Sequence, residues 1–241
     1  MKYFLNLLIF LFFVNINTSF AQKINSKFPQ DYEEVSIELL NEEYWFTHYD
    51  NKNIVLEKQC EQIIVSELTY KKTEKLWIVE SSFGGLLGVD SGQWIGGLYH
   101  IAGYGVPNLI KKMNVNHLHI TNDDRVLFFD INYGNGKSTL NEIYQNEDTA
   151  DLEIEKILNF DDLPTMIYYD KDGSFYVLGK KNIYRYIDRN LVPILGINIW
   201  KDIEPKSVVQ DSKNCLIVGI RGGILEIDIN NKSLKLFVKK K

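Results

Sequence analysis

Cysteine is scarce in this sequence: its 241 residues include two, Cys60 and Cys215. Two cysteines define no disulfide framework, so a bridge between them and a pair of separate buried thiols both remain open. The sequence has no CxxC pair and no Cys/His spacing typical of a zinc site. A structural zinc centre is therefore not expected.

Basic charge is also in short supply. The chain carries 27 lysines and arginines against 32 aspartates and glutamates, a formal net charge of −5. A general nucleic-acid-binding protein needs a basic footprint to displace counterions from phosphates, so no nucleic-acid partner is expected. The lysines at positions 239–241 form a run that is shorter than the basic clusters that bind acidic surfaces.

The apolar stretch near the N-terminus is short as well. Phe4–Val14 contains 11 residues, whereas a membrane-spanning helix needs roughly 20. Lys2 precedes this stretch, and the small side chains of Ser19 and Ala21 follow it. The pattern predicts a signal peptide that is cleaved after Ala21. An uncleaved anchor is the alternative.

The predicted signal peptide, residues 1–21, would leave a mature chain of residues 22–241. This chain loses the single charge of Lys2, which changes the net charge from −5 to −6. No cysteine lies near the cleavage site, so a lipid anchor is not expected. We expect a secreted or periplasmic protein that forms a single domain and makes no stable membrane insertion after cleavage.

The rest of the chain lacks a sustained helical period. Short apolar, aromatic-rich runs alternate with turn residues, which predicts an all-β fold. The runs recur in groups of up to four, and Gly179 and Gly219 lie 40 residues apart, as do Asp188 and Asp228. Such a period is typical of a β-propeller. Five units in 220 residues give 44 residues each, so we predict a β-propeller of about five four-stranded blades, with a β-sandwich as the alternative.

The strands of the first two groups are predicted as follows. The first group comprises Val35–Leu40, Tyr44–Tyr49 and Asn53–Leu56, and the second comprises Ile63–Tyr70, Leu76–Val79, Gly97–Ile101 and Leu109–Met113. In this assignment a long loop, residues 80–95, joins the second and third strands of the second group.

Parts of the pattern resemble a known repeat. The resemblance is carried by Asp170–Gly179 with Tyr184–Asp188, by Leu216–Gly219 with Gly222–Ile224, and by Leu76–Val79 with Gly96–Leu98. These segments are similar to the bacterial regulator-propeller repeat, and the similarity extends loosely over the mature chain. In that family the repeats build sensor ectodomains with more blades and attached signalling parts. Since this sequence contains neither, the resemblance implies the fold and no signalling role.

Binding is predicted on the face where the second strand of each blade joins the third. Two such loops are long, residues 80–95 and 132–139, and they belong to adjacent blades. Binding residues concentrate in long loops on rigid scaffolds. The candidate ligand-binding residues in these loops are Phe83, Asp90, Gln93, Trp94, Tyr133 and Asn135. They suit a protein or glycan partner; alternatively, the apolar side chains of the first loop only tuck it onto the propeller.

Other motifs do not amount to a metal or cofactor site. His117 and His119 alternate on one strand, so their imidazoles are predicted to share a face, but the spacing defines no third ligand. The stretch 136–138, Gly-Lys-Ser, resembles the end of a phosphate-binding loop, yet Ile131 occupies the position of the required first glycine. Residues 170–173 hold only a fragment of a calcium-loop pattern. Neither a metal nor a cofactor is expected.

The sequence therefore favours an exported, non-enzymatic binding module. The alternative is a small carbohydrate-active enzyme that uses carboxylates lining a propeller tunnel, with Glu80 and Asp130 as candidates. Against it, 44 residues per blade leave little loop for subsites, and no serine-nucleophile motif is present. A third class is an exported immunity-type or assembly protein with a basic partner that complements the acidic surface.

Overall fold

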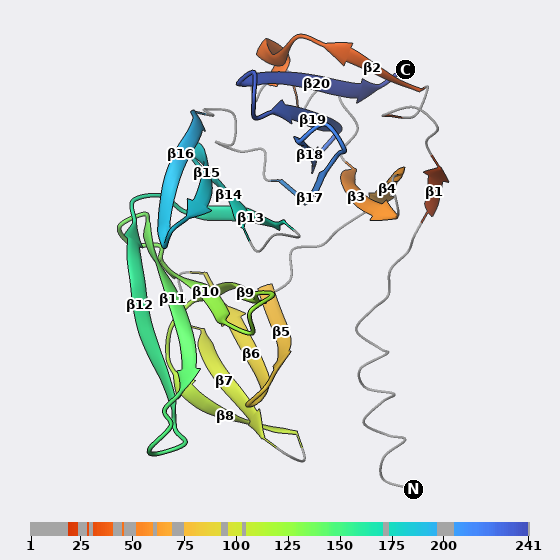
Figure 1. Ribbon diagram of the computed structural model, residues 1–241. Helices are drawn as coiled ribbons and strands as arrows, with labels where there is room; N and C mark the ends of the chain where they lie inside the picture. The colour runs from red at the N-terminus through yellow and green to blue at the C-terminus, as the bar shows by residue number, and fades with distance from the viewer. Residues whose placement is uncertain are drawn as a thin grey trace, which may run out of the picture. The chain divides into compact units, whose positions relative to one another are not determined.

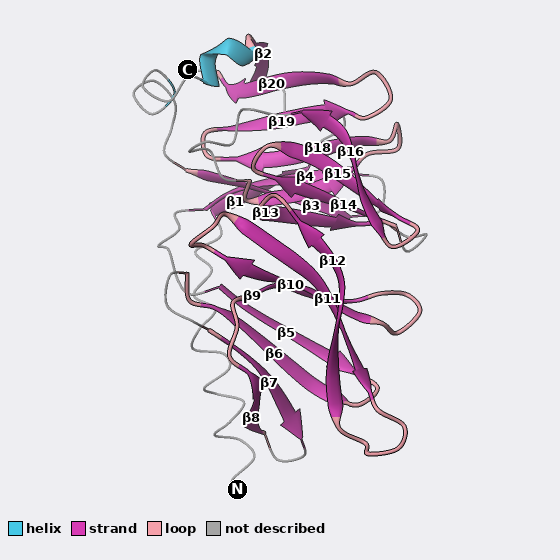
Figure 2. Ribbon diagram, turned by 90° about the vertical axis from the view of Figure 1, so that its left-hand side faces the viewer, coloured by secondary structure: helices cyan, strands magenta, loops and turns pink. Residues whose placement is uncertain are grey.

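The computed structural model describes residues 19–23, 28, 31–40, 45, 52–59, 62–68, 75–92, 96–102, 105–170, 174–196 and 205–240. Over these residues the fold is all-β, with antiparallel strand pairs, the short 3₁₀-helix η1 (Ile37–Leu40) and a helical conformation at Trp45 (Figures 1 and 2). The chain divides into two compact units. The first comprises residues 1–71, 206–228 and 233–241, and the second comprises residues 72–205 and 229–232.

The second unit contains three four-stranded antiparallel sheets, each made of four consecutive strands. The first sheet has the order β5 (Lys75–Ser81), β6 (Gly84–Asp90), β7 (Gly97–Ala102) and β8 (Val106–Lys111). The second contains β9 (Val115–Ile120), β10 (Val126–Asn132), β11 (Lys137–Gln145) and β12 (Leu152–Phe160). The third contains β13 (Pro164–Tyr169), β14 (Phe175–Gly179), β15 (Asn182–Ile187) and β16 (Asn190–Gly196).

The first unit contains two sheets. One has five strands in the order β17 (Ser207–Gln210), β18 (Cys215–Ile220), β19 (Gly223–Asp228), β20 (Ser233–Lys239) and β2 (Tyr32–Val35). The other has three strands in the order β1 (Ser19–Lys23), β4 (Gln62–Leu68) and β3 (Asn53–Gln59). Strand β1 spans the predicted cleavage site, and the two residues that cleavage would retain, Gln22 and Lys23, pair with β4.

The predicted fold class is confirmed. Among the described residues, five antiparallel sheets form blade-like units of a propeller-like β fold. The third predicted group, His117–Thr121, Val126–Ile131, Leu140–Tyr144 and Leu152–Leu158, corresponds strand by strand to β9–β12. The fourth, Thr165–Tyr169, Phe175–Leu178, Ile183–Ile187 and Leu191–Leu195, corresponds to β13–β16. The fifth, Ser207–Gln210, Cys215–Ile220, Ile224–Ile229 and Leu234–Val238, corresponds to β17–β20. Consecutive strands pair within each of these sheets, which is the up-and-down connection of a propeller blade.

The prediction was wrong for the first group of strands. Residues 32–40 form β2 and η1 rather than one strand, and β2 pairs with β20 at the outer edge of the last sheet. Of the predicted strand Tyr44–Tyr49, the structure describes only Trp45, which is 1% exposed and donates its indole N–H to the carbonyl of Arg221 (2.8 Å). The pairing of β2 with β20 joins opposite ends of the chain, and no local pattern encodes such a partner.

The prediction was also wrong for the segment 80–95, which is not one long loop. It contains β6, which is central in its sheet and pairs with both β5 and β7. Gly88, in the middle of this strand, has a packing role. A Cβ on Gly88 would lie 2.4 Å from Cγ1 of Val115 in β9, so Gly88 allows the neighbouring sheet to approach closely.

The core of the second unit lies in two layers on opposite faces of the β9–β12 sheet. Side chains of β10 alternate between them: Val126 and Phe128 join a cluster with Leu86 and Leu98 of the first sheet. Leu127 and Phe129 join a second cluster, which contains residues of β13–β16. Because successive side chains of a strand point to opposite faces, a strand sandwiched between two sheets is apolar on both.

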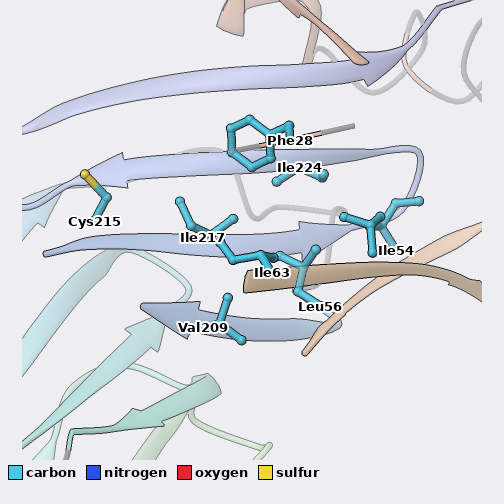
Figure 3. Close-up of a cluster of buried hydrophobic side chains, with 9 residues drawn as sticks. Phe28, Ile54, Leu56, Ile63, Val209, Cys215, Ile217 and Ile224 are labelled. Atoms are coloured by element: carbon cyan, nitrogen blue, oxygen red, sulfur yellow. The ribbon is translucent and has the colours of Figure 1, made fainter. Parts of the chain in front are cut away.

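The core of the first unit packs the three-stranded sheet against β17–β19. Ile54, Leu56 and Ile63 lie against Val209, Ile217 and Ile224 (Figure 3). The same cluster contains Phe28 and the buried Cys215. Cys60 lies outside the described residues, so the bridge between Cys60 and Cys215 stays a prediction.

Candidate functional site

The candidate site lies where the first two sheets of the second unit end side by side. At this end β6 leads into the connection to β7, and β10 leads into the connection to β11. The hydroxyl of Tyr133, which follows β10, donates a hydrogen bond to Oδ2 of Asp90, the last residue of β6 (2.6 Å). Two of the residues predicted for the binding face, from neighbouring blades, are therefore in direct contact.

Asp90 is the buried anchor of this end, with 5% of its surface exposed. Besides Tyr133, its Oδ2 accepts a hydrogen bond from Nδ2 of Asn116 (3.0 Å), and its Oδ1 accepts one from the N–H of Gly92 (2.9 Å). Hydrogen bonds to a charged group contribute about 1.5–3 kcal/mol each. Three donors from two sheets thus hold this carboxylate, and it ties the two sheets together at their shared end.

Asn114, directly before β9, forms hydrogen bonds with residues of both sheets at this end. Its Oδ1 accepts a hydrogen bond from the N–H of Gly96 (3.0 Å), and its Nδ2 donates to the carbonyl of Gly92 (2.9 Å). Its own N–H donates to Oδ1 of Asp130 (3.2 Å). Burial raises the pKa of the Asp130 carboxyl, and this effect outweighs the opposing effects of the Asn114 N–H and of Lys111.

The connection that carries Tyr133 is a tight turn ordered by asparagines. Oδ1 of Asn132 accepts hydrogen bonds from the N–H groups of Gly134 (3.0 Å) and Asn135 (3.3 Å), and Oδ1 of Asn135 accepts one from the N–H of Lys137 (3.1 Å). Such side-chain-to-backbone bonds fix a turn without help from elsewhere. Tyr133 therefore projects from a preformed turn, with 37% of its surface exposed.

The term Asp90–Tyr133 site is used below for five residues: Asp90, Asn114, Asn116, Asp130 and Tyr133. Of the six predicted ligand-binding residues, the structure brings Asp90 and Tyr133 together and places Asn135 in the adjoining turn. Gln93 and Trp94 lie outside the described residues, between Gly92 and Gly96, whose backbones the site holds.

Phe83 does not belong to this end. It lies in the turn between β5 and β6, whereas Asp90 closes β6, and a seven-residue strand separates their ends by about 20 Å. The Phe83 side chain packs against the buried cluster between the first two sheets, and its carbonyl accepts a hydrogen bond from Nε2 of His100 (2.8 Å). These contacts agree with the alternative interpretation, in which Phe83 holds its turn onto the sheet.

The two histidines of β9 do not share a face, contrary to the prediction. His117 has a φ of 55°, and the register of β9 against β10 shifts at this point. Its ring lies 5.6 Å from that of Trp77 in the first sheet, whereas the ring of His119 stacks on Tyr169 in the third sheet, 3.2 Å between centroids. An extra residue in a strand reverses the side-chain alternation beyond it, and the pair therefore separates.

No group of three or more His, Cys, Asp or Glu side chains placed to hold a metal ion occurs within the part of the chain that the structure describes. Burial lowers the pKa of His119 to about 4, so its ring is neutral at physiological pH. Within the same part of the chain, no helix is both long and apolar enough to cross a membrane.

Two asparagines of the site, Asn114 and Asn116, were not among the predicted residues. Asn114 and Asn116 are 8% and 0% exposed. They lie at the start of β9, next to the buried apolar residues Met113 and Val115. The available signal is the pattern Asn-Val-Asn over residues 114–116. Two amides at a spacing of two on a buried strand require buried partners, and such partners point to a polar cluster between blades.

Comparison with known proteins yields limited similarity: no family model and no curated protein matches the chain. One similar solved structure is the extracellular domain of the one-component system BT4673 from B. thetaiotaomicron, with 14% identity and a TM-score of 0.31; the match covers 78% of this chain and 29% of that one. The chain thus spans less than a third of that domain. Another is KlHsv2 with loop 6CD replaced by a Gly-Ser linker, with 9% identity, a TM-score of 0.32 and coverage of 80% and 82%. At these TM-scores neither structure assigns a function. The evidence for the fold is the strand pairing within the chain.

Proposed function

We propose that this protein is an exported, non-enzymatic binding module that takes a protein or glycan partner at the Asp90–Tyr133 site. The observation that carries the proposal is the hydrogen bond from the exposed Tyr133 to the buried Asp90. It presents an aromatic ring at the surface while its polar tip is already satisfied inside the protein. Export is inferred from the N-terminal sequence alone.

An aromatic side chain held in this way is well suited to recognition. Ordering a side chain on binding costs about 0.5–1.5 kcal/mol, and Tyr133 is already ordered by its turn and by Asp90. The ring offers apolar contact area, and the exposed Asn135 lies two residues away in the same turn. Rigid aromatic groups beside amides serve both protein surfaces and sugar rings, so the partner class is decided by experiment.

The chain offers a matched control for Tyr133. Tyr144 is exposed to a similar extent, 40% against 37%, and its hydroxyl also donates to a carboxylate, Oε2 of Glu153 (2.6 Å). It lies near the opposite end of β11 from the Tyr133 turn. Tyr144→Ala therefore removes an equivalent tyrosine from the same sheet and leaves the site unchanged.

The test has two arms. Binding of fluorescently labelled cellotriose, maltotriose and chitotriose is titrated. A photoreactive amino acid at position 137, where the exposed lysine side chain takes no part in the turn, captures protein partners in envelope fractions. Tyr133→Ala should weaken binding at least tenfold, because exposed aromatic anchors dominate binding energy, whereas Tyr144→Ala should leave it unchanged. Silence in both arms, or equal losses in the two variants, would refute the proposal.

One observation favours the enzymatic alternative. Burial raises the pKa of Asp130, and a glycoside-cleaving enzyme needs one carboxyl whose pKa is raised. The other candidate, Glu80, is exposed on β5. Release of reducing sugar from the same trisaccharides, abolished by Asp130→Asn, would establish the alternative in place of the binding module.

A further inference from the structure

The connection between β6 and β7 has a glycine near its start, Gly92, and another at its end, Gly96. Gly92 has a φ of 69°, and a Cβ on Gly96 would lie 2.0 Å from the carbonyl oxygen of Val89. Neither glycine has a side chain with which to pack or bond. The positions of their backbones therefore depend on groups supplied by other residues.

Two side chains supply those groups. Oδ1 of Asp90 accepts the N–H of Gly92, and the amide of Asn114 takes both the carbonyl of Gly92 and the N–H of Gly96. Asn114 comes from the neighbouring sheet and is itself held, because its N–H donates to Asp130 and its carbonyl accepts the N–H of Ile131 (3.0 Å). The Asn114 side chain thus bonds to one backbone N–H and one backbone carbonyl, as a peptide group of a neighbouring strand would.

An asparagine is required for this arrangement. Its carboxamide offers one acceptor and two donor hydrogens on the same short side chain. An aspartate would retain the acceptor for Gly96 but present an oxygen to the carbonyl of Gly92, and it would add a charge next to Asp130. A leucine of similar size would remove the partner of both backbone groups, which are partly buried.

We propose that Asn114 is a positioning residue for partner binding. It holds the backbones of Gly92 and Gly96, and Gly92 in turn donates to Asp90, the anchor of Tyr133. Through these bonds Asn114 supports the affinity of the site without touching the partner itself. This inference rests on the proposed function. A role in stability alone would predict a lower melting temperature with unchanged affinity, so affinity at matched stability separates the two roles.

The matched control is Asn141, a buried asparagine in β11 with 5% of its surface exposed, whose Nδ2 donates to the carbonyl of Thr139 (2.9 Å). Asn114→Ala and Asn141→Ala each remove a buried amide from the same sheet. Amide hydrogen exchange of Gly92 and Gly96 reports the connection directly and requires no partner. Binding is measured with the tightest-binding of the three labelled trisaccharides or, if none of them binds, with the protein captured through position 137.

Asn114→Ala should accelerate exchange of the Gly96 amide at least tenfold and weaken binding tenfold or more. Asn141→Ala should leave both unchanged. The isosteric Asn114→Asp keeps the acceptor for Gly96, so it should retain Gly96 protection and still bind several-fold more weakly than the wild type; it also serves if the alanine variant does not fold. Faster Gly96 exchange with unchanged affinity would overturn the inference while leaving the proposed function intact. Binding that is insensitive to Tyr133→Ala as well would reject the proposed function instead.

Discussion

Replacement of Gly88 by alanine tests the assignment of residues 84–90 as a central strand. Gly88 pairs with Trp77 of β5 and with Leu98 of β7, so β6 cannot shift within its sheet. The new methyl carbon would lie 2.4 Å from Cγ1 and 3.0 Å from Cβ of Val115, which is fully buried in β9. Normal carbon–carbon contacts are about 3.5–4.0 Å, so one of the two sheets must move.

The expected cost follows from these distances. Overpacking a core by one methyl group costs about 1–3 kcal/mol, and the smaller entropy of the unfolded alanine chain returns about 0.4–1 kcal/mol. A net loss of about 1–2 kcal/mol corresponds to a fall of about 2–8 °C in the melting temperature of a chain of this size. Gly196→Ala is the control, because the nearest atom to its Cβ is Asn182 Oδ1 at 3.5 Å.

The assay is a double-mutant cycle read by thermal melting. Val115→Ala removes Cγ1, the nearer of the two clashing atoms, and keeps Cβ at 3.0 Å, so the cost of Gly88→Ala should be clearly smaller in the Val115→Ala background. A coupling free energy of at least about 1 kcal/mol between the two sites is expected for residues in direct contact. A neutral or stabilising effect of Gly88→Ala in the wild-type background would show that residues 84–90 do not form this packed strand.

Three further predictions concern stability and export. Gly179→Ala should lower stability by about 2–4 kcal/mol, because its methyl group would lie 2.4 Å from Oδ2 of Asp162, a buried carboxylate that holds several N–H donors; urea unfolding measures the loss. Burial lowers the pKa of His119 from 6.5 to about 4, so the stability linked to its neutral ring is present above pH 6.5 and is lost as the pH falls toward 4. His119→Gln should flatten the fall in melting temperature between pH 7 and pH 5, and an unchanged slope would contradict this. Mass spectrometry of the exported protein should find Gln22 at the N-terminus, and a retained Met1 would contradict cleavage after Ala21.

Much of the fold could be predicted because the information is local. Strands β14 and β18 are continuous apolar runs, buried over their whole lengths, and runs of this kind are typical of strands sandwiched between sheets. The 40-residue spacing of Gly179 and Gly219 then sets the repeat. Long-range pairing has no such signal: β2 lies beside β20, with Glu34 opposite Phe237, and nothing near residue 34 identifies that partner.

The parts of the site that could be predicted are those that follow from blade connectivity. Connections between second and third strands emerge at one end of each blade, so Asp90 and Tyr133 could be assigned to a common face. Asn114 could not, because its role arises from two glycine backbones in the neighbouring sheet. Phe83 was placed on the same face because residues 80–95 were predicted as one loop, whereas β6 within this segment puts Phe83 and Asp90 at opposite ends of a strand.

Substitution of Tyr133 by phenylalanine separates the exposed ring from its buried anchor. The variant keeps the ring but removes the hydroxyl that donates to Oδ2 of Asp90, which then retains Asn116 as its side-chain donor. Loss of a hydrogen bond to a buried carboxylate should cost about 1–3 kcal/mol of stability. The released ring must also be ordered on binding, at about 0.5–1.5 kcal/mol, so affinity should fall about two- to tenfold, less than for Tyr133→Ala.

The order of the binding affinities of wild type, Tyr133→Phe and Tyr133→Ala therefore tests whether Asp90 holds the Tyr133 ring in place. If the ring makes the contact and Asp90 holds it in place, affinity should decrease from wild type to Tyr133→Phe to Tyr133→Ala, as measured by titration with the same probe. Equal losses in the two variants would mean that the partner contacts the hydroxyl. If Tyr133→Phe had the affinity and melting temperature of the wild type, the hydrogen bond to Asp90 would not hold the Tyr133 ring in place. The proposal that the ring is ordered before the partner binds would then have no physical basis.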